Sequence, residues 1–285
     1  MITINIQKAL YGSSAEMNLQ VDLNIAQNDF VALAGQSGSG KTTLLRILAG
    51  LEDSRGVIQV GDEIWQDSDK KIHLAPQKRK IGFVFQDYAL FSNMSVKDNL
   101  LYVKKDKALA SHLLEITGLT SFKNRFPNTL SGGQKQRVSL CRAMMNSPKL
   151  LLMDEPLSAL DPQMRTKLQN EILSLHKEFA TTTIMVSHDP SEIYRLANRA
   201  VVLNLGQIIN DGTPKEILLQ TSGSAKFSFE GELLDIIKVD VIHVAVIAIA
   251  QQIVEVVVSE EEVGTLSIGQ TVRVGTKAFS PIISG

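Results

Sequence analysis

The sequence predicts an α/β domain built on a parallel sheet, followed by a small all-β domain. Up to about residue 219, short apolar runs alternate with segments that carry apolar residues at helical spacing. This is the order of strands joined by helices. A small polar linker, Thr221–Ala225, comes next, and beyond it strand-like segments follow one another. We therefore assign residues 1–222 to the first domain and residues 224–285 to the second.

The first strands are indicated by their apolar pattern. Ile2–Ile6 and Leu19–Ile25 alternate between apolar and polar residues and are expected to pair. Phe30–Ala34 is a continuous apolar run, which is typical of a buried strand. Residues 43–49 carry apolar residues at helical spacing, and Gly50 is placed to cap that helix. Short strand-like pieces then run from Val57 to Ile72.

The middle of the first domain is predicted to be helical. Ile81–Phe85 is expected as a buried strand that ends at Gln86, and Leu150–Met153 as another strand covered on both faces. Between them, helical patterns cover Val96–Val103, Ala108–Ile116 and Gly132–Met145. This insertion predicts a helical subdomain at about residues 87–146.

Strands and helices again alternate in the rest of the first domain, and only strands are expected in the second. Pro162–Phe179 is expected as a helix, with Asp161 as its cap and Pro162 in its first turn. A strand, a helix and a hairpin around Gly206 are expected at Thr183–Val186, Pro190–Ala197 and Ala200–Asn210. The second domain is expected to hold strands at Phe227–Leu234, Val241–Ile249, Ile253–Ser259 and Val272–Gly275.

Composition excludes several classes of protein. The chain of 285 residues is 44% hydrophobic, and its 29 basic residues balance 30 acidic ones, which argues against broad binding to nucleic acid. A single cysteine, Cys141, excludes an internal disulfide framework. Residues 1–6 lack the order of a signal peptide, and residues 239–258 are too polar to span a bilayer. We therefore expect a soluble or peripheral protein with no nucleic-acid partner.

Residues Gly35–Thr42 fit a phosphate-binding pattern of two glycines with four residues between them, followed by Lys and Thr. A loop between a strand and a helix directs backbone N–H groups and the helix dipole at an anion. Lys41 should reach the β- and γ-phosphates of ATP, and the Thr42 hydroxyl should bind Mg²⁺. The alternative is a glycine-rich turn with an exposed lysine. The expected phosphate-binding residues of this loop are Gly35, Ser37, Gly38, Gly40, Lys41, Thr42 and Thr43.

Two acids, Asp154 and Glu155, directly follow the apolar run Leu150–Met153. They are placed at the carboxyl end of a strand, where ligands bind in open α/β sheets. Asp154 would hold Mg²⁺, directly or through water, and Glu155 could polarise the attacking water. The alternative is a solvated acidic turn.

The segment Leu130–Gln134, with the sequence Leu-Ser-Gly-Gly-Gln, precedes a helical pattern. Ser131 and the amides of Gly132 and Gly133 therefore make a second anion site at a helix N-terminus. One nucleotide does not need two unrelated phosphate cradles in one chain. We expect two chains paired head to tail, each Ser131 facing the γ-phosphate bound to the other chain.

These segments together resemble the ATP-binding subunit of the ABC transporter family. The resemblance spans nearly everything up to about Leu219 and implies a P-loop cassette with a parallel-sheet core, an antiparallel β subdomain and a helical subdomain. The matching segments, in the family's order, are Gly35–Thr42, Gln86, Leu130–Gln134, Asp154-Glu155-Pro156, Ser158-Ala159-Leu160-Asp161 and His188.

The resemblance also implies roles for single residues. Gln86 senses Mg²⁺ and the attacking water, His188 contacts the γ-phosphate, Asp161 links the two sites of the dimer, and Tyr11 stacks on adenine. The expected catalytic set is Glu155, His188, Gln86 and Lys41; the expected Mg²⁺ ligands are Thr42, Gln86 and Asp154; and Ser131, Gly133, Gln134 and Asp161 complete the ATP site.

The same resemblance implies the setting of the protein. Two ATP-hydrolysing subunits, using ATP and Mg²⁺, are expected at the cytoplasmic face of the cell membrane, as peripheral subunits docked on integral membrane permease subunits. An external substrate-binding protein would act with them indirectly. The docking surface is expected within residues 87–128.

Several alternatives stay open on the sequence alone. Tyr11 could instead pack half-buried at a strand end, and Lys78–Lys80 is expected as a solvated loop. A soluble ABC-type ATPase acting on DNA or the ribosome is disfavoured, because the chain has one cassette and no sustained heptads. A protein that only senses nucleotide is disfavoured by the intact acid at Glu155. The other histidines, which show no metal-site spacing, are His73, His112, His176 and His243.

The second domain resembles the small Mop/TOBE domain of molybdate importer ATPases. The resemblance implies molybdate or a related oxyanion as cargo, and an oxyanion site at Ser224, Lys226 and Lys277, whose hydroxyl and cations suit a tetrahedral anion. Lys226 stands where that family has Arg, and Lys cannot form the bidentate fork. A plain packing domain is the alternative, since importers for sulfate, iron, polyamines and sugars carry related domains. The matching segments are Ser224–Lys226, Phe229–Leu234, Glu260–Gly264, Ser267–Gln270 and Thr276–Ala278.

Overall fold

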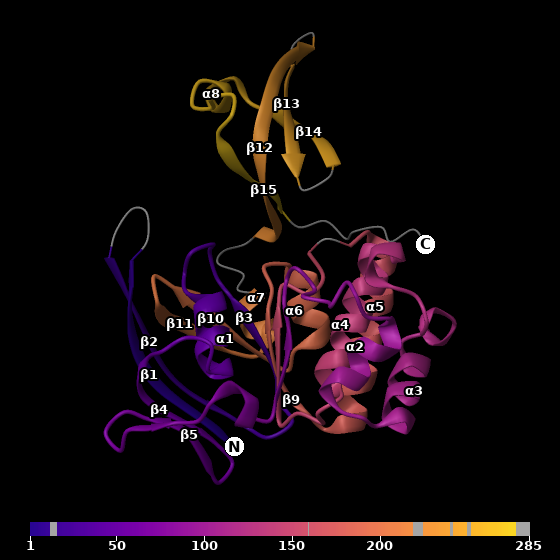
Figure 1. The fold of residues 1–285 in the computed structure, drawn as a ribbon. Coiled ribbons are helices and arrows are strands. Elements are labelled where there is room, and N and C mark those ends of the chain that lie inside the picture. The colour runs from indigo at the N-terminus through magenta and orange to yellow at the C-terminus, as the bar shows by residue number, and fades with distance from the viewer. Residues whose placement is uncertain (12–15, 159, 219–224, 240–241, 250–251, 278–285) are drawn as a thin grey trace. The chain divides into compact units, whose positions relative to one another are not determined.

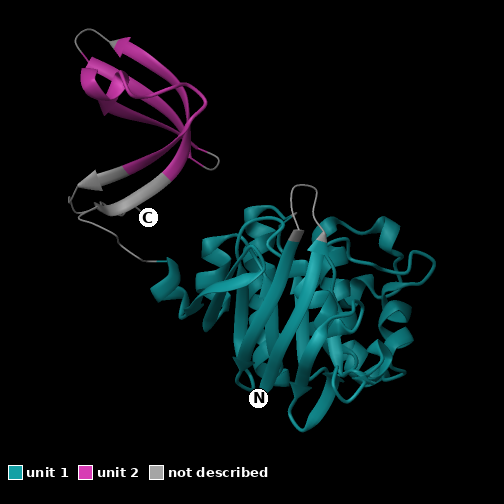
Figure 2. Ribbon diagram, turned by 90° about the vertical axis from the view of Figure 1, so that its left-hand side faces the viewer, with its two compact units in different colours: residues 1–219 teal, residues 220–285 magenta. Residues whose placement is uncertain are grey.

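The structure, a computed structural model, describes two compact units. The described residues are 1–11, 16–158, 160–218, 225–239, 242–249 and 252–277. The first unit is Met1–Leu219 and the second is Gln220–Gly285 (Figure 2).

The first unit is built on an eleven-stranded sheet that is parallel in one part and antiparallel in the other (Figure 1). Its strand order is β6-β5-β4-β1-β2-β11-β10-β3-β9-β8-β7. The parallel part consists of β10 (Arg199–Asn204), β3 (Phe30–Ala34), β9 (Thr182–Val186), β8 (Leu150–Asp154) and β7 (Ile81–Val84). The antiparallel part consists of β1 (Ile2–Tyr11), β2 (Glu16–Ile25), β4 (Arg55–Val60), β5 (Glu63–Asp67) and β6 (Ile72–His73), while β11 (Gln207–Gly212) forms the predicted hairpin with β10. The predicted α/β fold is confirmed.

Helices of this unit begin and end where local signals place them. Gly50 adopts φ 73° after α1 and its N–H donates to the carbonyls of Arg46 and Ile47, as the predicted C-cap does. The Asp161 carboxylate accepts a hydrogen bond from the Met164 N–H at 3.0 Å and caps α5. The helices are α1 (Lys41–Ala49), α2 (Val96–Val103), α3 (Lys107–Ile116), α4 (Gly132–Met144), α5 (Pro162–Phe179), α6 (Pro190–Leu196) and the unpredicted α7 (Pro214–Leu218). No helix in the described part of the chain is long and apolar enough to cross a membrane.

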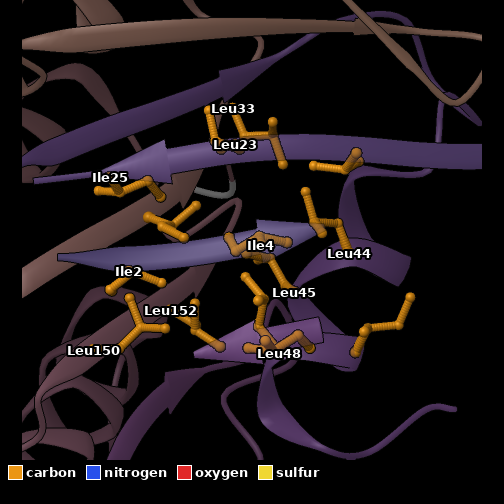
Figure 3. Packing of buried hydrophobic residues seen from close by; sticks show 14 of the residues in the cluster. Ile2, Ile4, Leu23, Ile25, Leu33, Leu44, Leu45, Leu48, Leu150 and Leu152 are labelled. Atoms are coloured by element: carbon orange, nitrogen blue, oxygen red, sulfur yellow. The ribbon is translucent and has the colours of Figure 1, made fainter. Parts of the chain in front are cut away.

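One buried cluster joins the phosphate-loop helix to both parts of the sheet. Apolar side chains of α1 pack with those of the antiparallel strands and of the parallel strands (Figure 3). Burying such side chains stabilises the fold by roughly 1.5–3 kcal/mol each. The loop before α1 is therefore held by a rigid base. The labelled members of the cluster are Ile2, Ile4, Leu23, Ile25, Leu33, Leu44, Leu45, Leu48, Leu150 and Leu152.

The expectation of a solvated loop at Lys78–Lys80 is wrong for its central residue. Arg79 is only 2% exposed, and its guanidinium donates to the carbonyls of Ile47 and Leu48 at 2.9 and 2.8 Å. These carbonyls belong to the last turn of α1, whose final carbonyls lack partners within the helix. Arg79 therefore caps α1 from a distant part of the chain, which no local pattern reveals.

The second unit is a four-stranded antiparallel sheet in the order β14-β13-β12-β15. Leu233, Ala245 and Ile247 form its buried centre. The first strand extends further than its predicted range, and the expected acidic turn at Glu260–Gly264 contains a short helix capped by Ser259. The elements are β12 (Ala225–Val239), β13 (Ile242–Ile249), β14 (Gln252–Val258), α8 (Glu260–Val263) and β15 (Thr271–Lys277).

Candidate functional site

The loop between β3 and α1 has a backbone that only glycine allows at its first position. Gly35 has φ 133°, and a Cβ there would lie 2.0 Å from the Leu203 carbonyl oxygen of β10. Gly40, with φ 99°, is the N-cap of α1, and no side chain caps the N-terminus of this helix. The first N–H groups of α1 are therefore free of side-chain caps, which is the arrangement that binds phosphate at a helix N-terminus.

Lys41 lies inside this loop, with only 8% of its surface exposed. Its ammonium donates hydrogen bonds to the carbonyls of Gly35 and Gln36 at 2.8 and 2.7 Å. Burial lowers the pKa of Lys41, while the charges of Glu155 and Asp154 raise it. The cation is thus held at the centre of the loop, next to two acids.

Thr42 and Asp154 are brought together from α1 and β8. The Thr42 hydroxyl donates to the Asp154 carboxylate at 3.2 Å. Burial raises the pKa of Asp154, and the Thr42 bond acts against that rise. Protein-bound Mg²⁺ is usually held by one or two carboxylates and hydroxyls together with substrate phosphates, and this oxygen pair fits that donor set. Within the described residues, no group of three or more His, Cys, Asp or Glu side chains could hold a metal on its own.

Glu155 adopts a backbone conformation that is uncommon for a residue with a side chain. Its φ is 45°, and its N–H donates to the Val186 carbonyl at 3.2 Å. The Gln86 amide donates to one Glu155 carboxylate oxygen at 3.5 Å, and the His188 Nδ1 lies 3.7 Å from the other. Left-handed non-glycine residues cluster at functional sites. Three residues from the ends of β7, β8 and β9 therefore meet at one point.

A cleft of about 960 Å³ covers the loop and reaches Glu155. Its size suits a ligand such as a nucleotide. The antiparallel strands and the β10–β11 turn supply lining residues that the sequence patterns did not indicate, because no local pattern marks a residue that only folding brings to the loop. The predicted residues at the cleft are Ser37, Gly38, Gly40, Lys41, Thr42, Thr43 and Glu155, and the additional ones include Lys8, Leu10, Met17, Glu52, Asn204 and Leu205.

The residues predicted to complete the ATP site from a second copy, Ser131, Gly133, Gln134 and Asp161, are not at this cleft. Among the described lining residues, none belongs to the segment Ser131–Gln134, and Asp161 is not among them either. The Ser131 hydroxyl accepts from the Gln134 N–H at 3.4 Å, and the Gln134 side chain accepts from the Ser131 N–H at 2.9 Å. Gly133 lies so close to Met164 of α5 that a Cβ would approach that side chain to 2.3 Å.

Two further predictions fall partly outside the described residues. Tyr11 is the last residue of β1 and its backbone pairs with Glu16, but its side chain is not among the described ones. In the second unit, Ala225 pairs with Lys277, so the strand ends that carry Lys226 and Lys277 lie next to each other. Ser224 and the side chains of both lysines lie outside the described part, so adenine stacking and oxyanion binding stay predictions.

Comparisons with known proteins agree with this geometry. The family described as "ABC transporter" matches residues 19–158. The chain is 40% identical to the sulfate/thiosulfate import ATP-binding protein CysA of Nocardia farcinica, over 82% of this chain and 71% of that protein. It is 45% identical to the molybdenum import ATP-binding protein ModC of Saccharophagus degradans, over 74% of this chain and 59% of that protein. It thus spans between about three fifths and seven tenths of the length of these relatives.

A solved structure shares the fold of the first unit. It is the dimeric, post-hydrolysis form of the ATP-binding cassette MJ0796 bound to ADP and Pi. The similarity has a TM-score of 0.64 at 29% identity, and covers 75% of this chain and 99% of that one.

Proposed function

Because this chain belongs to the ABC transporter family, we propose that it is the ATP-hydrolysing subunit of a membrane importer. The observation that carries the proposal is the convergence of Lys41, Thr42 and Glu155 on one cleft of about 960 Å³. Asp154 lies directly behind Thr42. A loop that binds phosphate, an oxygen pair that can bind Mg²⁺ (Thr42 and Asp154) and a further carboxylate (Glu155) are the groups that phosphoryl transfer to water requires.

Residues of the cleft would bind the phosphates of ATP and Mg²⁺. The N–H groups of the loop bind the phosphates, and Lys41 exchanges its bonds to two loop carbonyls for bonds to phosphate oxygens. Thr42 and Asp154 would hold Mg²⁺, which neutralises phosphate charge when bound.

Glu155, which directly follows β8, would act on the attacking water. Glu155 orients the attacking water and accepts its proton, while His188 contacts the γ-phosphate. Gln86, at 3.5 Å from the same carboxylate, holds Glu155 in place. Adenine would stack on Tyr11, whose side chain lies outside the described residues.

We also propose that two copies of the chain close on ATP head to tail. Ser131 is exposed and does not line the cleft of its own chain, so its expected phosphate must belong to another copy. Asp161 is exposed as well, on the turn before α5. The dimeric cassette MJ0796 supports this arrangement.

The helical subdomain offers an exposed aromatic pair for the permease subunits. Phe91 and Tyr102 are 37% and 65% exposed, and their ring centroids lie 4.7 Å apart. Exposed aromatic residues are enriched in protein interfaces. We place the membrane contact here, within the expected range 87–128, which would hold the chain at the cytoplasmic face of the membrane. An external substrate-binding protein would act through the permease.

The test of the activity is the variant Glu155→Gln in the purified full chain. Steady-state ATP turnover should fall by about 10²–10⁴-fold, because removing a general base costs roughly 3–5 kcal/mol of barrier. ATP binding should persist, and the variant should elute as a dimer in ATP. Glu52→Gln, at the other acid among the lining residues, is the matched control and should keep most of the turnover, because Glu52 pairs with Lys8 and Arg46. Wild-type turnover in Glu155→Gln would exclude the proposed role.

For the cargo, we propose a tetrahedral oxyanion, with molybdate first. The support is the resemblance of the second unit to Mop/TOBE domains; the relatives do not favour molybdate, since they are named for sulfate, molybdenum and iron import. Calorimetry with molybdate, tungstate and sulfate tests whether the second unit binds such an anion. If molybdate or tungstate binds and this binding is lost in Lys277→Ala, the result supports a cargo-sensing role. If Lys277→Ala leaves the binding unchanged, the oxyanion site does not include Lys277. If no oxyanion binds, the cargo-sensing role is excluded.

A further inference from the structure

One arginine joins the two segments that flank the carboxylate of Glu155. Arg165 lies in the first turns of α5, after the segment Ser158–Asp161. Its Nη1 donates to the Asp189 carboxylate at 3.1 Å, and its Nη2 donates to the Leu160 carbonyl at 3.4 Å. A single guanidinium thus contacts both the turn before α5 and the residue that follows His188.

The acceptors of this arginine are themselves held in place. One Asp189 oxygen caps α6 by accepting from the Ser191 N–H at 2.8 Å, while the other accepts from Arg165. Glu192 lies 3.6 Å from the Arg165 Nε, is 5% exposed, and accepts from the Ser187 hydroxyl at 2.6 Å. Residues on both sides of His188 are therefore tied to one cation.

The cluster encloses a small polar cavity that includes the candidate base. The cavity has a volume of about 40 Å³, which is enough for a water molecule. Glu155 and His188 lie on its wall together with Arg165. A shift of the guanidinium would therefore change the surroundings of the residues that meet the attacking water.

We propose that Arg165 is a positioning residue that couples the Ser158–Asp161 turn to His188. The inference rests on the proposed ATPase function. Asp161 is expected to face the ATP site of the other copy, whereas His188 belongs to the site of its own chain. Arg165 contacts Leu160 on one side and Asp189 on the other. It thereby couples the position of Asp161 at the ATP site of the other copy to the position of His188 at the ATP site of its own chain.

The physical reason lies in the charges around the guanidinium. Without it, the carboxylates of Asp189, the N-cap of α6, and of Glu192, in the first turn of that helix, would lose the cation that pairs with both, and like charges in such a place repel. The Leu160 carbonyl also loses a donor. The segment that carries His188 and the turn that carries Asp161 then move independently.

The chain offers a matched control on the same two helices. Arg195 of α6 donates to the Asn170 side chain of α5 at 2.9 Å. This bridge joins α5 and α6 as Arg165 does, but neither partner lines the cavity or the cleft among the described residues. A purely structural role in holding α5 and α6 together would lower the stability of each variant, without a selective loss of kcat or of the Hill coefficient in Arg165→Ala.

The experiment compares Arg165→Ala, Arg165→Lys and Arg195→Ala in the purified full chain. We expect Arg165→Ala to lower kcat by about 10- to 100-fold and to reduce the Hill coefficient for ATP toward one, with the ATP Kd changed less than about threefold. Arg165→Lys should restore part of kcat, and Arg195→Ala should behave as the wild type. A double-mutant cycle with Asp189→Asn should show losses that are not additive.

Several results would overturn the coupling role. They are unchanged kcat and Hill coefficient in Arg165→Ala, equal losses in Arg165→Ala and Arg195→Ala, or additive losses with Asp189→Asn. If Arg165→Ala does not fold, Arg165→Lys and Arg165→Gln give the same comparison, with thermal unfolding as the check on folding. A wild-type chain that turns over no ATP even when assembled with its permease subunits would instead refute the proposed function, so the two failures are distinguishable.

Discussion

Two helices of the first unit begin at glycine-containing loops, and their N-termini are completed in opposite ways. At α1, no side chain caps the first turn, and the loop before it lines the cleft. At α4, Ser131 and Gln134 form a capping box in which each side chain accepts a hydrogen bond from the backbone of the other. At α4 the N–H groups of Ser131 and Gln134 are thus satisfied within the chain, whereas the N-cap of α1, Gly40, supplies no such bond and leaves the N–H groups of its first turn for a ligand.

Glycines at a helix start therefore do not make two equivalent anion sites in this chain. The loop at α1 is anchored by the buried cluster beneath it and presents its N–H groups to a cleft. The start of α4 faces outward, and the Ser131 hydroxyl, which accepts from the Gln134 N–H, can still donate its own proton to a phosphate of another copy. The following predictions separate these two cases.

The largest effect is expected from Ser131→Arg. In the proposed dimer, a bulky cation at this place prevents closure on ATP, and turnover should fall by about 10³-fold. ATP binding to the isolated chain should stay close to that of the wild type, because the cleft of the same chain does not include Ser131. Turnover by coupled assay and ATP affinity by calorimetry measure the two quantities.

A mixing experiment gives the control for this variant. Chains with Ser131→Arg and chains with Lys41→Ala, mixed in equal amounts, should form dimers with one intact site at most. Loss of ATP binding by isolated Ser131→Arg chains would contradict the assignment of the two helix ends to different copies.

The second prediction concerns the stability of the α1 loop. Gly35→Ala should lower the free energy of unfolding by at least about 3 kcal/mol, for two reasons. The new Cβ would lie 2.0 Å from the Leu203 carbonyl oxygen, and the backbone φ of 133° at this position is strained for alanine. Gly38 has φ 79° with open space around it, so Gly38→Ala should cost only about 1 kcal/mol. Urea denaturation of both variants measures the difference. Equal losses would mean that the loop is not held against β10.

The third prediction concerns the ion pair that joins α4 to α5. Arg137 of α4 and Glu171 of α5 form a buried ion pair at 2.9 Å, and burial raises the pKa of Glu171 to about 7 against the opposing effects of Arg137 and Lys167. Between about pH 4.5 and 7, the folded chain therefore retains a proton that the unfolded chain has lost. The stabilisation from this proton is complete below about pH 4.5 and is lost as the pH rises through about 7.

The comparison with Glu171→Gln isolates this contribution. From pH 5 to pH 8, the free energy of unfolding of the wild type should fall by about 1–2 kcal/mol more than that of the variant. The exposed residue Glu115 provides the control, since Glu115→Gln should leave the slope unchanged. Parallel slopes for wild type and Glu171→Gln would contradict the shifted pKa.

The smallest effect is expected from the capping box itself. Ser131→Ala removes the cap of α4 and should lower the free energy of unfolding by about 1 kcal/mol. Ser37→Ala, in the exposed loop before α1, should change it by less than about 0.5 kcal/mol. Thermal unfolding of the two variants tests whether only one of the two helix ends has a side-chain cap.

Elements with local signals could be predicted from the amino-acid sequence. The predicted ranges Val96–Val103 and Pro162–Phe179 match α2 and α5 residue for residue. Caps such as Gly50 and Asp161 were also predicted, because a cap acts on backbone groups a few residues away. The phosphate loop and the acids after β8 could be identified for the same reason, since each is a short pattern with neighbours of a known type.

Contacts between residues far apart in the chain could not be predicted from the sequence and are known from the fold. Arg79 belongs to a basic run that predicts a solvated loop, yet it caps α1 because the fold brings its guanidinium to carbonyls more than thirty residues away. The contact of His188 with Glu155 and the contacts of Arg165 likewise depend on β8 and β9 being neighbours in the sheet. Strand order and helix packing set these distances, and neither leaves a periodic or local trace in the chain.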